Sequence, residues 1–447
     1  MKEELIRRIR TKSATVAVIG LGYVGLPTAV IVANSGFKVI GVDIDLVKVE
    51  AVKRGESYLS EPKLKDLLRT AISEKKITAI NDIAQAVSEC DITVLCVSTP
   101  TSSDGLPDLS ILNKVCDRVA EVLERQKLVI VESTVPPGTT QRTIARLEKV
   151  SKLVCGTDFW CAYCPERMYS GRAIQEFIEN DRLVGACDNS SSEIAAEFLS
   201  TIATGKVHRT SVAIAEIAKL AENTFRDVNI AFANELALIC EKAGADVAEV
   251  IRLTNTHPRV KIHKPGCGVG GSCLPKDPYF LIQVFEDKLP SWDVVQRARE
   301  LNSHMPVHLV ELVVDALRNV RGEIKHAKVA VLGVAYKGQT DDVRNTPAEI
   351  VVKQLLGLGA DVHVFDPCSV ETFGAKRAKA LEEALDHADC VVICTDHPEF
   401  TCLEPDKIRG YLSRQAIIVD GRRVLDPLLV RKAGIKYFGV GFGETVS

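Results

Sequence analysis

The sequence TVAVIGLGYVGLP, residues 15–27, places the pattern Gly-x-Gly-x-x-Gly between an apolar, β-branched run and a segment suited to a helix. The pattern predicts a buried strand over 15–20 and a helix over 27–35. A second apolar run, FKVIGVD, ends in Asp43, eighteen positions after the last glycine of the pattern. A strand, a glycine-rich turn, a helix and a second strand ending in an acid are the start of a doubly wound α/β domain.

Each glycine of this turn has its own physical task. We expect Gly20 to permit the tight turn, Gly22 to let a pyrophosphate approach the backbone, and Gly25 to allow close helix–strand packing. The phosphates would then meet unpaired N–H groups at the helix N-terminus. Asp43 can accept hydrogen bonds from adenosine ribose hydroxyls and would repel a 2′-phosphate, so the pattern favours NAD over NADP. A glycine-rich turn without a ligand is the structural alternative.

Short apolar runs alternate with helix-length segments in two separate parts of the chain. The first part continues with runs at 91–99 and 127–134, and the alternation returns after about residue 323. We therefore expect an α/β fold with two doubly wound, Rossmann-like parallel sheets. The second part begins KVAVLGVAYKG and lacks the three-glycine pattern, so it should not bind a second dinucleotide in the same way. The strands expected there are 328–336, 361–367, 389–396 and 416–424, with a helix near 346–357.

A long apolar helix is expected between the two parts. Residues 212–244 carry apolar side chains at helical spacing, with Gly244 suited to the C-cap. This helix is too apolar to lie alone in water, so it should pack between domains or subunits. Lys219 and Asn223 are four positions apart and share one of its faces. The domains expected are an NAD-binding domain over 1–205, a central helical domain over 206–318 and a C-terminal Rossmann-like domain over 319–447.

Composition excludes several classes of protein. The 447 residues are 46% hydrophobic and 26% charged, with a net charge of −3, so no basic surface indicates a nucleic-acid partner. No apolar run approaches the roughly 18 residues of a membrane span. The amphipathic start MKEELIRRIRTK predicts a leading helix and not an export signal, so we expect a cytoplasmic protein with mostly reduced cysteines. One Cys-x-x-Cys pair, Cys161 and Cys164, has no second pair or histidine cluster, so we expect no metal.

The loop PGCGVGGSCLPKD, residues 265–277, sets one thiol behind four glycines and ahead of a cation and a carboxylate. A ligand could approach Cys273 closely, Lys276 would favour its thiolate, and Asp277 could act as a base or orient a water. With NAD, a thiolate can add to an aldehyde, and the adduct can lose hydride and give a thioester. A structural cysteine near a turn is the alternative that these residues alone leave open.

Seven motifs occur in one order across nearly the whole chain: GLGYVGLP, ESTVPPGT, CPER, the Lys-x-x-x-Asn helix, GGSCLPKD, YKGQTDDVRNTP and DGRRVLD. Together they resemble the UDP-glucose/GDP-mannose dehydrogenase family. The resemblance implies oxidation of the C6 alcohol of a nucleotide sugar to a carboxylate, with two NAD and no metal. It implies that Cys273 is the nucleophile, that Lys219 and Asn223 bind the C6 oxygen, and that Asp277 positions a water or Lys219.

The resemblance also implies the ligands of cofactor and substrate. Thr134 and Glu166 would flank the hydrolytic water and the nicotinamide. An arginine of the Arg259 type reaches the neighbouring subunit's site, which implies an obligate homodimer built on the long helix. The NAD ligands would be Gly20, Gly22, Tyr23, Val24, Gly25, Asp43, Lys48, Thr99, Thr134, Lys276 and Arg344. The nucleotide sugar would be held by Glu166, Arg167, Lys219, Asn223, His257, Arg259, Gly270, Gly271, Lys337 and Arg422.

The sugar itself is indicated by longer stretches. Residues 162–186 and 255–271 resemble the branch that oxidises UDP-N-acetyl-D-mannosamine, whereas Ser272 and Lys276 resemble the UDP-glucose branch. We expect UDP-N-acetyl-D-mannosamine, with UDP-glucose and UDP-N-acetylglucosamine as alternatives. A single-step hydroxyacid dehydrogenase would need neither Cys273 nor a second α/β domain, and a non-catalytic NAD-binding protein would not need the thiol either.

Overall fold

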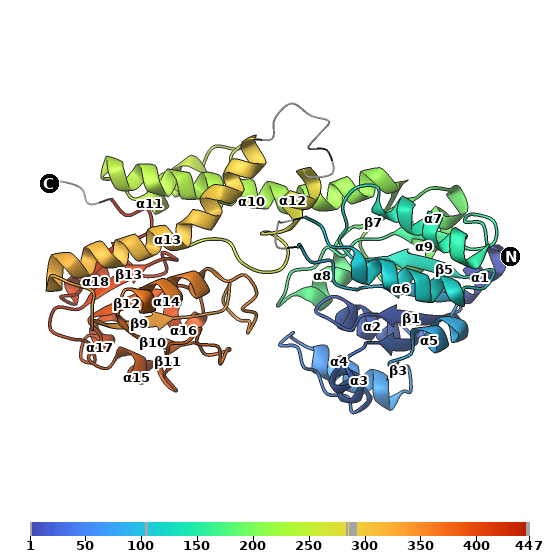
Figure 1. Cartoon of the computed structure of the whole chain (residues 1–447), viewed down its shortest axis with the longest axis horizontal. Coiled ribbons are helices and arrows are strands. Elements are labelled where there is room, and N and C mark those ends of the chain that lie inside the picture. Colours follow the sequence, from blue (N-terminus) through green and yellow to red (C-terminus); the bar gives the residue numbers. More distant parts are fainter. Residues whose placement is uncertain (1, 103–105, 283–284, 286–292, 444–447) are drawn as a thin grey trace. The chain divides into compact units, whose positions relative to one another are not determined.

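The computed structural model describes residues 2–102, 106–282, 285 and 293–443. The chain divides into two compact units, residues 1–222 with 279–286 and residues 223–278 with 287–447. Each unit contains one β-sheet covered by helices (Figure 1).

The sheet of the first unit has the strand order β3-β2-β1-β4-β5-β6-β7-β8. Its pairs are parallel except for β6 and β7, which are antiparallel. The sequence predicts a parallel sheet, and the pair of β6 and β7 is an exception. β7 starts beside the carboxyl end of β6, so the two strands run in opposite directions. The strands are β1 (Thr15–Ile19), β2 (Lys38–Val42), β3 (Ile77–Ile80), β4 (Ile92–Leu95), β5 (Leu128–Val131), β6 (Trp160–Tyr163), β7 (Arg182–Ala186) and β8 (Val207–Ser211).

Helices cover both faces of this sheet, because alternate strand residues point to opposite sides. Val16 and Val18 belong to one core, with α1, α2, α3, α4, α8 and α9, and Ala17 and Ile19 belong to the other, with α5, α6 and α7. The helices are α1 (Lys2–Arg10), α2 (Gly25–Asn34), α3 (Leu46–Lys53), α4 (Leu64–Ser73), α5 (Ile83–Glu89), α6 (Ser110–Glu121), α7 (Thr139–Ser151), α8 (Ala173–Glu179) and α9 (Asn189–Ser200).

The sheet of the second unit is parallel throughout, in the order β11-β10-β9-β12-β13-β14. Val329 and Val331 point to a core shared with α13 and α14, and Ala330 and Leu332 point to the opposite core. Its strands are β9 (Lys328–Leu332), β10 (Asp361–Phe365), β11 (Lys376–Arg377), β12 (Cys390–Ile393), β13 (Ile417–Asp420) and β14 (Lys436–Gly439). The helices that follow α10 are α11 (Val247–Thr254), α12 (Asp277–Ile282), α13 (Asp293–Arg321), α14 (Pro347–Gly357), α15 (Leu381–Leu385), α16 (Pro398–Thr401), α17 (Pro405–Ile408) and α18 (Pro427–Lys432).

The long helix predicted between the sheets is α10 (Val212–Ala243), and Gly244 follows it with φ +69°. The expected fold class, two Rossmann-like sheets and a helical middle, is confirmed. Cys161 and Cys164 lie in the two opposite cores of the first sheet, so their thiols cannot share a metal ion. Among the residues that the structure describes, no helix is both long and apolar enough to cross a membrane.

Candidate active site

In the glycine turn after β1, packing requires two of the three glycines, whereas the third is free to serve a ligand. Gly20 has φ +94°, and a Cβ atom there would lie 2.6 Å from the Cys96 carbonyl oxygen. A Cβ at Gly25 would lie 1.7 Å from the Gly20 oxygen. A Cβ at Gly22 would meet nothing within 4 Å, so packing does not explain this glycine. The open backbone at Gly22 fits a pyrophosphate, as the NAD prediction requires.

Asp43 lies at the end of β2 beside this turn. Its carboxylate accepts the Leu21 N–H at 2.8 Å, and the Lys48 ammonium lies 3.7 Å away. Tyr23 is exposed and Val24 is the residue before α2, so both lie on the turn itself. The expected ribose acceptor is therefore beside the expected phosphate site, with a cation next to it.

Thr99 and Thr134 lie beyond the carboxyl ends of β4 and β5, the edge at which doubly wound sheets bind ligands. The Thr99 hydroxyl donates to the Thr134 carbonyl at 2.7 Å, so the structure brings these two predicted residues together.

Glu132 was not predicted, although it belongs to the ESTVPPGT motif. Its buried carboxylate accepts hydrogen bonds from Thr28 at 3.0 Å and from Cys96 at 2.9 Å, and the Arg182 guanidinium lies 3.3 Å away. Burial raises the pKa of Glu132. Cys96 also lies beside Gly20 and Gly25 of the glycine turn. Glu132 therefore supports that turn through its hydrogen bond with Cys96.

Glu166 and Lys219 form a buried ion pair at 2.9 Å, and Glu166 also accepts the Met168 N–H at 2.7 Å. Burial by itself raises the pKa of Glu166, but the Lys219 ammonium and the Met168 amide together hold that pKa below its ordinary value. Lys219 therefore has the anionic partner that a buried lysine needs. The neighbouring Arg167 is paired with Glu222 of α10 at 2.8 Å.

One turn further along α10, Asn223 donates to Asp277 at 2.7 Å. Asp277 is fully buried, and the Lys276 ammonium lies 3.8 Å from its other oxygen. The Cys273 carbonyl accepts both the Lys276 and the Asp277 N–H, at 3.0 and 2.8 Å. The Ser272 hydroxyl lies 3.5 Å from the Cys273 sulfur. The loop of the predicted nucleophile is thus joined to α10 through Asp277.

The glycine loop before Cys273 packs on the loop after β9. Gly271 has φ +88°, and its N–H donates to the Arg344 carbonyl at 2.9 Å. A Cβ at Gly270 would lie 2.6 Å from the Cβ of Tyr336, so only glycine fits there. The Arg344 side chain is held by Asp342 through two hydrogen bonds of 2.8 and 2.6 Å.

Two further predicted substrate cations lie at the carboxyl edge of the second sheet. Lys337 is buried beside Tyr336, and Arg422 lies 3.3 Å from Asp396. Asp396 also accepts the Gly338 N–H at 2.8 Å, a role that sequence reasoning missed.

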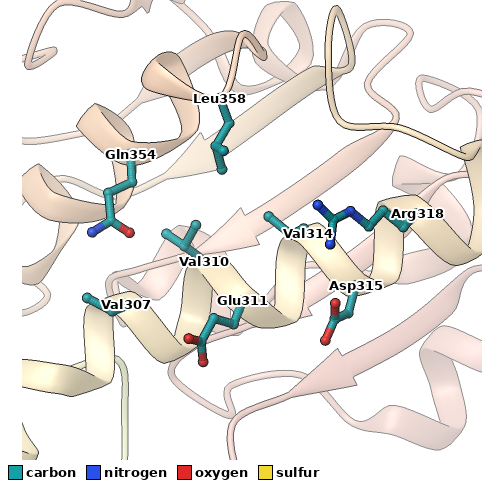
Figure 2. A pocket seen from close by; sticks show the side chains of 8 residues that line it. All are labelled: Val307, Val310, Glu311, Val314, Asp315, Arg318, Gln354 and Leu358. Atoms are coloured by element: carbon teal, nitrogen blue, oxygen red, sulfur yellow. The ribbon is translucent and has the colours of Figure 1, made fainter.

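His257 and Arg259 are exposed in the segment after α11. A groove between α13 and α14 is a separate feature (Figure 2). Its lining residues include no predicted site residue; they are Val307, Val310, Glu311, Val314, Asp315, Arg318, Gln354 and Leu358.

The chain is similar to known proteins over most of its length. Three domain profiles of the UDP-glucose/GDP-mannose dehydrogenase family match the chain: the NAD binding domain over 14–203, the central domain over 213–304 and the UDP binding domain over 330–427. The UDP-N-acetyl-D-mannosamine dehydrogenase of Pyrococcus horikoshii is 40% identical over 96% of this chain and 99% of its own.

Solved structures give the same result. The structure of the UDP-D-ManNAc dehydrogenase from Pyrococcus horikoshii matches with a TM-score of 0.90 at 39% identity, over 96% of this chain and 100% of that one. The UDP-glucose dehydrogenase from Pyrobaculum islandicum matches with a TM-score of 0.87 at 30% identity, over 96% and 98% of the two chains. Fold and turn define an NAD-dependent oxidoreductase. The chain belongs to the UDP-glucose/GDP-mannose dehydrogenase family, as its seven motifs predict.

Proposed function

We propose that this enzyme oxidises the C6 hydroxyl of UDP-N-acetyl-D-mannosamine to a carboxylate in two NAD-dependent steps. Several relatives carry that activity in their names, and residues 162–186 and 255–271 resemble the same branch. NAD, when bound, accepts a hydride in each step. The observation that carries the chemistry is the 2.7 Å hydrogen bond from Asn223 to Asp277, which joins the loop of Cys273 to α10.

Cys273 has the central role in this proposal. After the first oxidation its thiolate adds to the C6 aldehyde and forms a thiohemiacetal, which becomes a thioester when the second hydride leaves. Water then attacks the thioester, supplies the second carboxylate oxygen and releases the thiolate. The sum is one alcohol, two NAD and one water converted to one carboxylate, two NADH and three protons.

The polar residues of α10 and their partners stabilise negative charge on the C6 oxygen and position the hydrolytic water. Lys219 and Asn223 donate hydrogen bonds to the C6 oxygen while it carries negative charge. Glu166 pairs with the Lys219 ammonium at 2.9 Å and, with Thr134, flanks the hydrolytic water. Asp277 orients Asn223 through the bond described above.

We assign the ligands by unit. NAD is held by the turn Gly20–Gly25 with Asp43, by the other predicted residues of the first unit, and by Lys276 and Arg344. The nucleotide sugar is held by the glycine loop with Lys337 and Arg422. These assignments follow a division into an NAD domain over 1–205, a central domain over 206–318 and a UDP-sugar domain over 319–447.

We also propose a cytoplasmic homodimer that joins through α10 and supplies a uronate sugar for polysaccharide assembly. Five large apolar side chains on α10 are exposed, and they are Ile214, Ile217, Phe225, Phe232 and Ile239. Arg259 is exposed, so its side chain can reach a partner's site. The mass in solution tests the dimer, and Phe232→Asp should give monomers.

The substrate is tested by kcat/KM for three sugars. We expect UDP-N-acetyl-D-mannosamine to exceed UDP-glucose and UDP-N-acetylglucosamine by at least about tenfold, the discrimination that a few pocket contacts provide. A preference for UDP-glucose would mean that Ser272 and Lys276 are the better guide to the sugar. No turnover of any of the three would overturn the proposal.

A further inference from the structure

A second cluster of reactive side chains lies at the carboxyl edge of the second sheet, apart from the residues assigned above. Asp366 follows β10, Cys368 lies two residues on, and His397 follows β12. One ligand atom from each lies within 4.8 Å of the others. His397 is fully buried and Cys368 is exposed, so the imidazole is fixed and the thiol faces solvent.

Asp366 holds both of its neighbours in place. One of its oxygens accepts the Cys368 N–H at 2.8 Å, and the other lies 3.2 Å from Nε2 of His397. Amide donors from Val334 and Ala335, at 2.7 and 3.1 Å, fix the same carboxylate. With Nε2–H directed at Asp366, the nitrogen that faces Cys368 is Nδ1, 3.8 Å from the sulfur.

This is the arrangement of a metal-binding histidine, whose second ring nitrogen donates to a carboxylate. Two ligands of a tetrahedral Zn²⁺, one nitrogen and one sulfur, are about 3.5 Å apart. The observed 3.8 Å needs only a small rotation of the exposed Cys368 side chain. We propose that Cys368 and His397, held by Asp366, form a binding site for a thiophilic divalent metal ion such as Zn²⁺.

Charge around the thiol favours a bound cation over a reactive cysteine. The carboxylates of Asp366, Glu399 and Asp341 place negative charge around the exposed Cys368 thiol. These carboxylates repel a bare thiolate and attract a divalent ion. The metal–sulfur bond forms as the thiol proton leaves to water, and water fills the remaining coordination positions.

Metal binding would be coupled to the loop that carries Lys337. The Gln339 N–H donates to Nδ1 of His397 at 3.2 Å, and a metal ion on Nδ1 takes the lone pair that accepts it. Occupancy therefore releases Gln339, two residues from Lys337. If the proposed function of Lys337 holds, the metal ion inhibits the dehydrogenase.

The site is tested on the metal-free full chain by titration with Co²⁺ under anaerobic conditions. We expect a thiolate-to-cobalt charge-transfer band that saturates at one equivalent and is absent in Cys368→Ser. The matched control is Cys402→Ser, which alters another exposed cysteine of the second unit and should leave the band unchanged. A band that persists in Cys368→Ser, or no band in the unaltered protein, would overturn the site whether or not the enzyme oxidises the proposed sugar.

The coupling has its own test. Zn²⁺ should inhibit the unaltered enzyme, and Cys368→Ser should need at least about tenfold more Zn²⁺ for the same inhibition. Equal sensitivity of the two proteins would place the inhibitory zinc elsewhere and contradict the coupling to Gln339.

Discussion

Asp43 follows β2 in the first sheet and accepts the Leu21 N–H at 2.8 Å; Asp366 follows β10 in the second and accepts the Val334 N–H at 2.7 Å. The glycine that ends the preceding strand also has a positive φ in both, +94° at Gly20 and +88° at Gly333. Each sheet therefore has the same local arrangement: a strand, a turn that begins with a positive-φ glycine, and an acidic residue after the neighbouring strand that accepts an N–H of that turn.

The two acidic residues differ in how many of their hydrogen-bond acceptor positions remain available to a ligand. Asp43 accepts two backbone N–H groups, so its four acceptor positions are not filled. Asp366 accepts four backbone N–H groups and faces His397, so none remains for a ribose. Ala335 also stands where the first turn has Gly22. The same scaffold can thus serve a dinucleotide in one sheet and a different ligand in the other.

Removing the Cys273 thiol should abolish turnover but leave the binding of NAD and UDP intact. Cys273→Ser should lower kcat by about 10³-fold or more, because a protonated serine hydroxyl is a poor nucleophile at neutral pH and an alkoxide is a poor leaving group. Affinities for NAD and UDP, measured by calorimetry, should be unchanged. Cys187→Ser alters an exposed thiol of the first unit and is the control. Full turnover in Cys273→Ser would exclude the nucleophile.

The glycines test which parts of the turn belong to the fold. Gly25→Ala places a Cβ 1.7 Å from the Gly20 oxygen and should cost about 3 kcal/mol of unfolding free energy or more. Gly333→Ala should do the same in the second sheet, since its Cβ would lie 2.3 Å from Thr395.

Gly22→Ala is the matched variant, because its Cβ meets nothing within 4 Å. It should change unfolding free energy by no more than about 0.5 kcal/mol. Its Kd for NAD should rise about tenfold, because the backbone can no longer approach a phosphate. Urea unfolding and calorimetry measure the two effects, and an unchanged Kd would remove NAD from this turn.

The buried ion pair between Glu166 and Lys219 of α10 can be tested by measuring stability as a function of pH. Lys219→Met leaves Glu166 buried without its cation and should cost about 3 kcal/mol at neutral pH. In the unaltered protein the pKa of Glu166 is lowered from 4.5, so its stabilisation is present above 4.5 and is lost as pH falls towards the folded pKa.

In Lys219→Met, the burial that raises the pKa of Glu166 is opposed only by the Met168 amide and the Arg182 guanidinium, so its pKa should rise and this group's contribution should shrink or change sign. Unfolding free energies measured by urea between about pH 3 and 7 should then converge towards acid. A constant difference between the two proteins across that range would contradict the account of this pair.

The smallest expected effect concerns the two acids. Asp43→Asn should raise KM for NAD about tenfold, equivalent to about 1.4 kcal/mol, and weaken the rejection of NADP. Asp366→Asn should lower stability and leave KM for NAD unchanged, because its hydrogen bonds reach no residue assigned to NAD. Initial rates at varied NAD and NADP give the comparison, and an unaltered cofactor preference in Asp43→Asn would remove it from the ribose site.

Sequence reasoning found the features with a local pattern. Gly20, Gly22, Gly25 and Asp43 are recognisable because a strand, a turn and a helix fix their spacing. The partner of each polar residue was not predictable, because Glu166 meets Lys219 and Asn223 meets Asp277 across more than fifty positions. Glu132 and the cluster at His397 were missed for the same reason, although an acid at the end of β10 repeats the Asp43 pattern.

Two-step oxidation through Cys273 can be tested by counting the NADH formed for each sugar. Limiting UDP-N-acetyl-D-mannosamine is mixed with excess NAD and the purified enzyme, and absorbance is followed to completion. We expect two NADH for each sugar, because an alcohol reaches a carboxylate only after two hydrides have left. One NADH for each sugar, with an aldehyde or ketone as product, would contradict the thioester route.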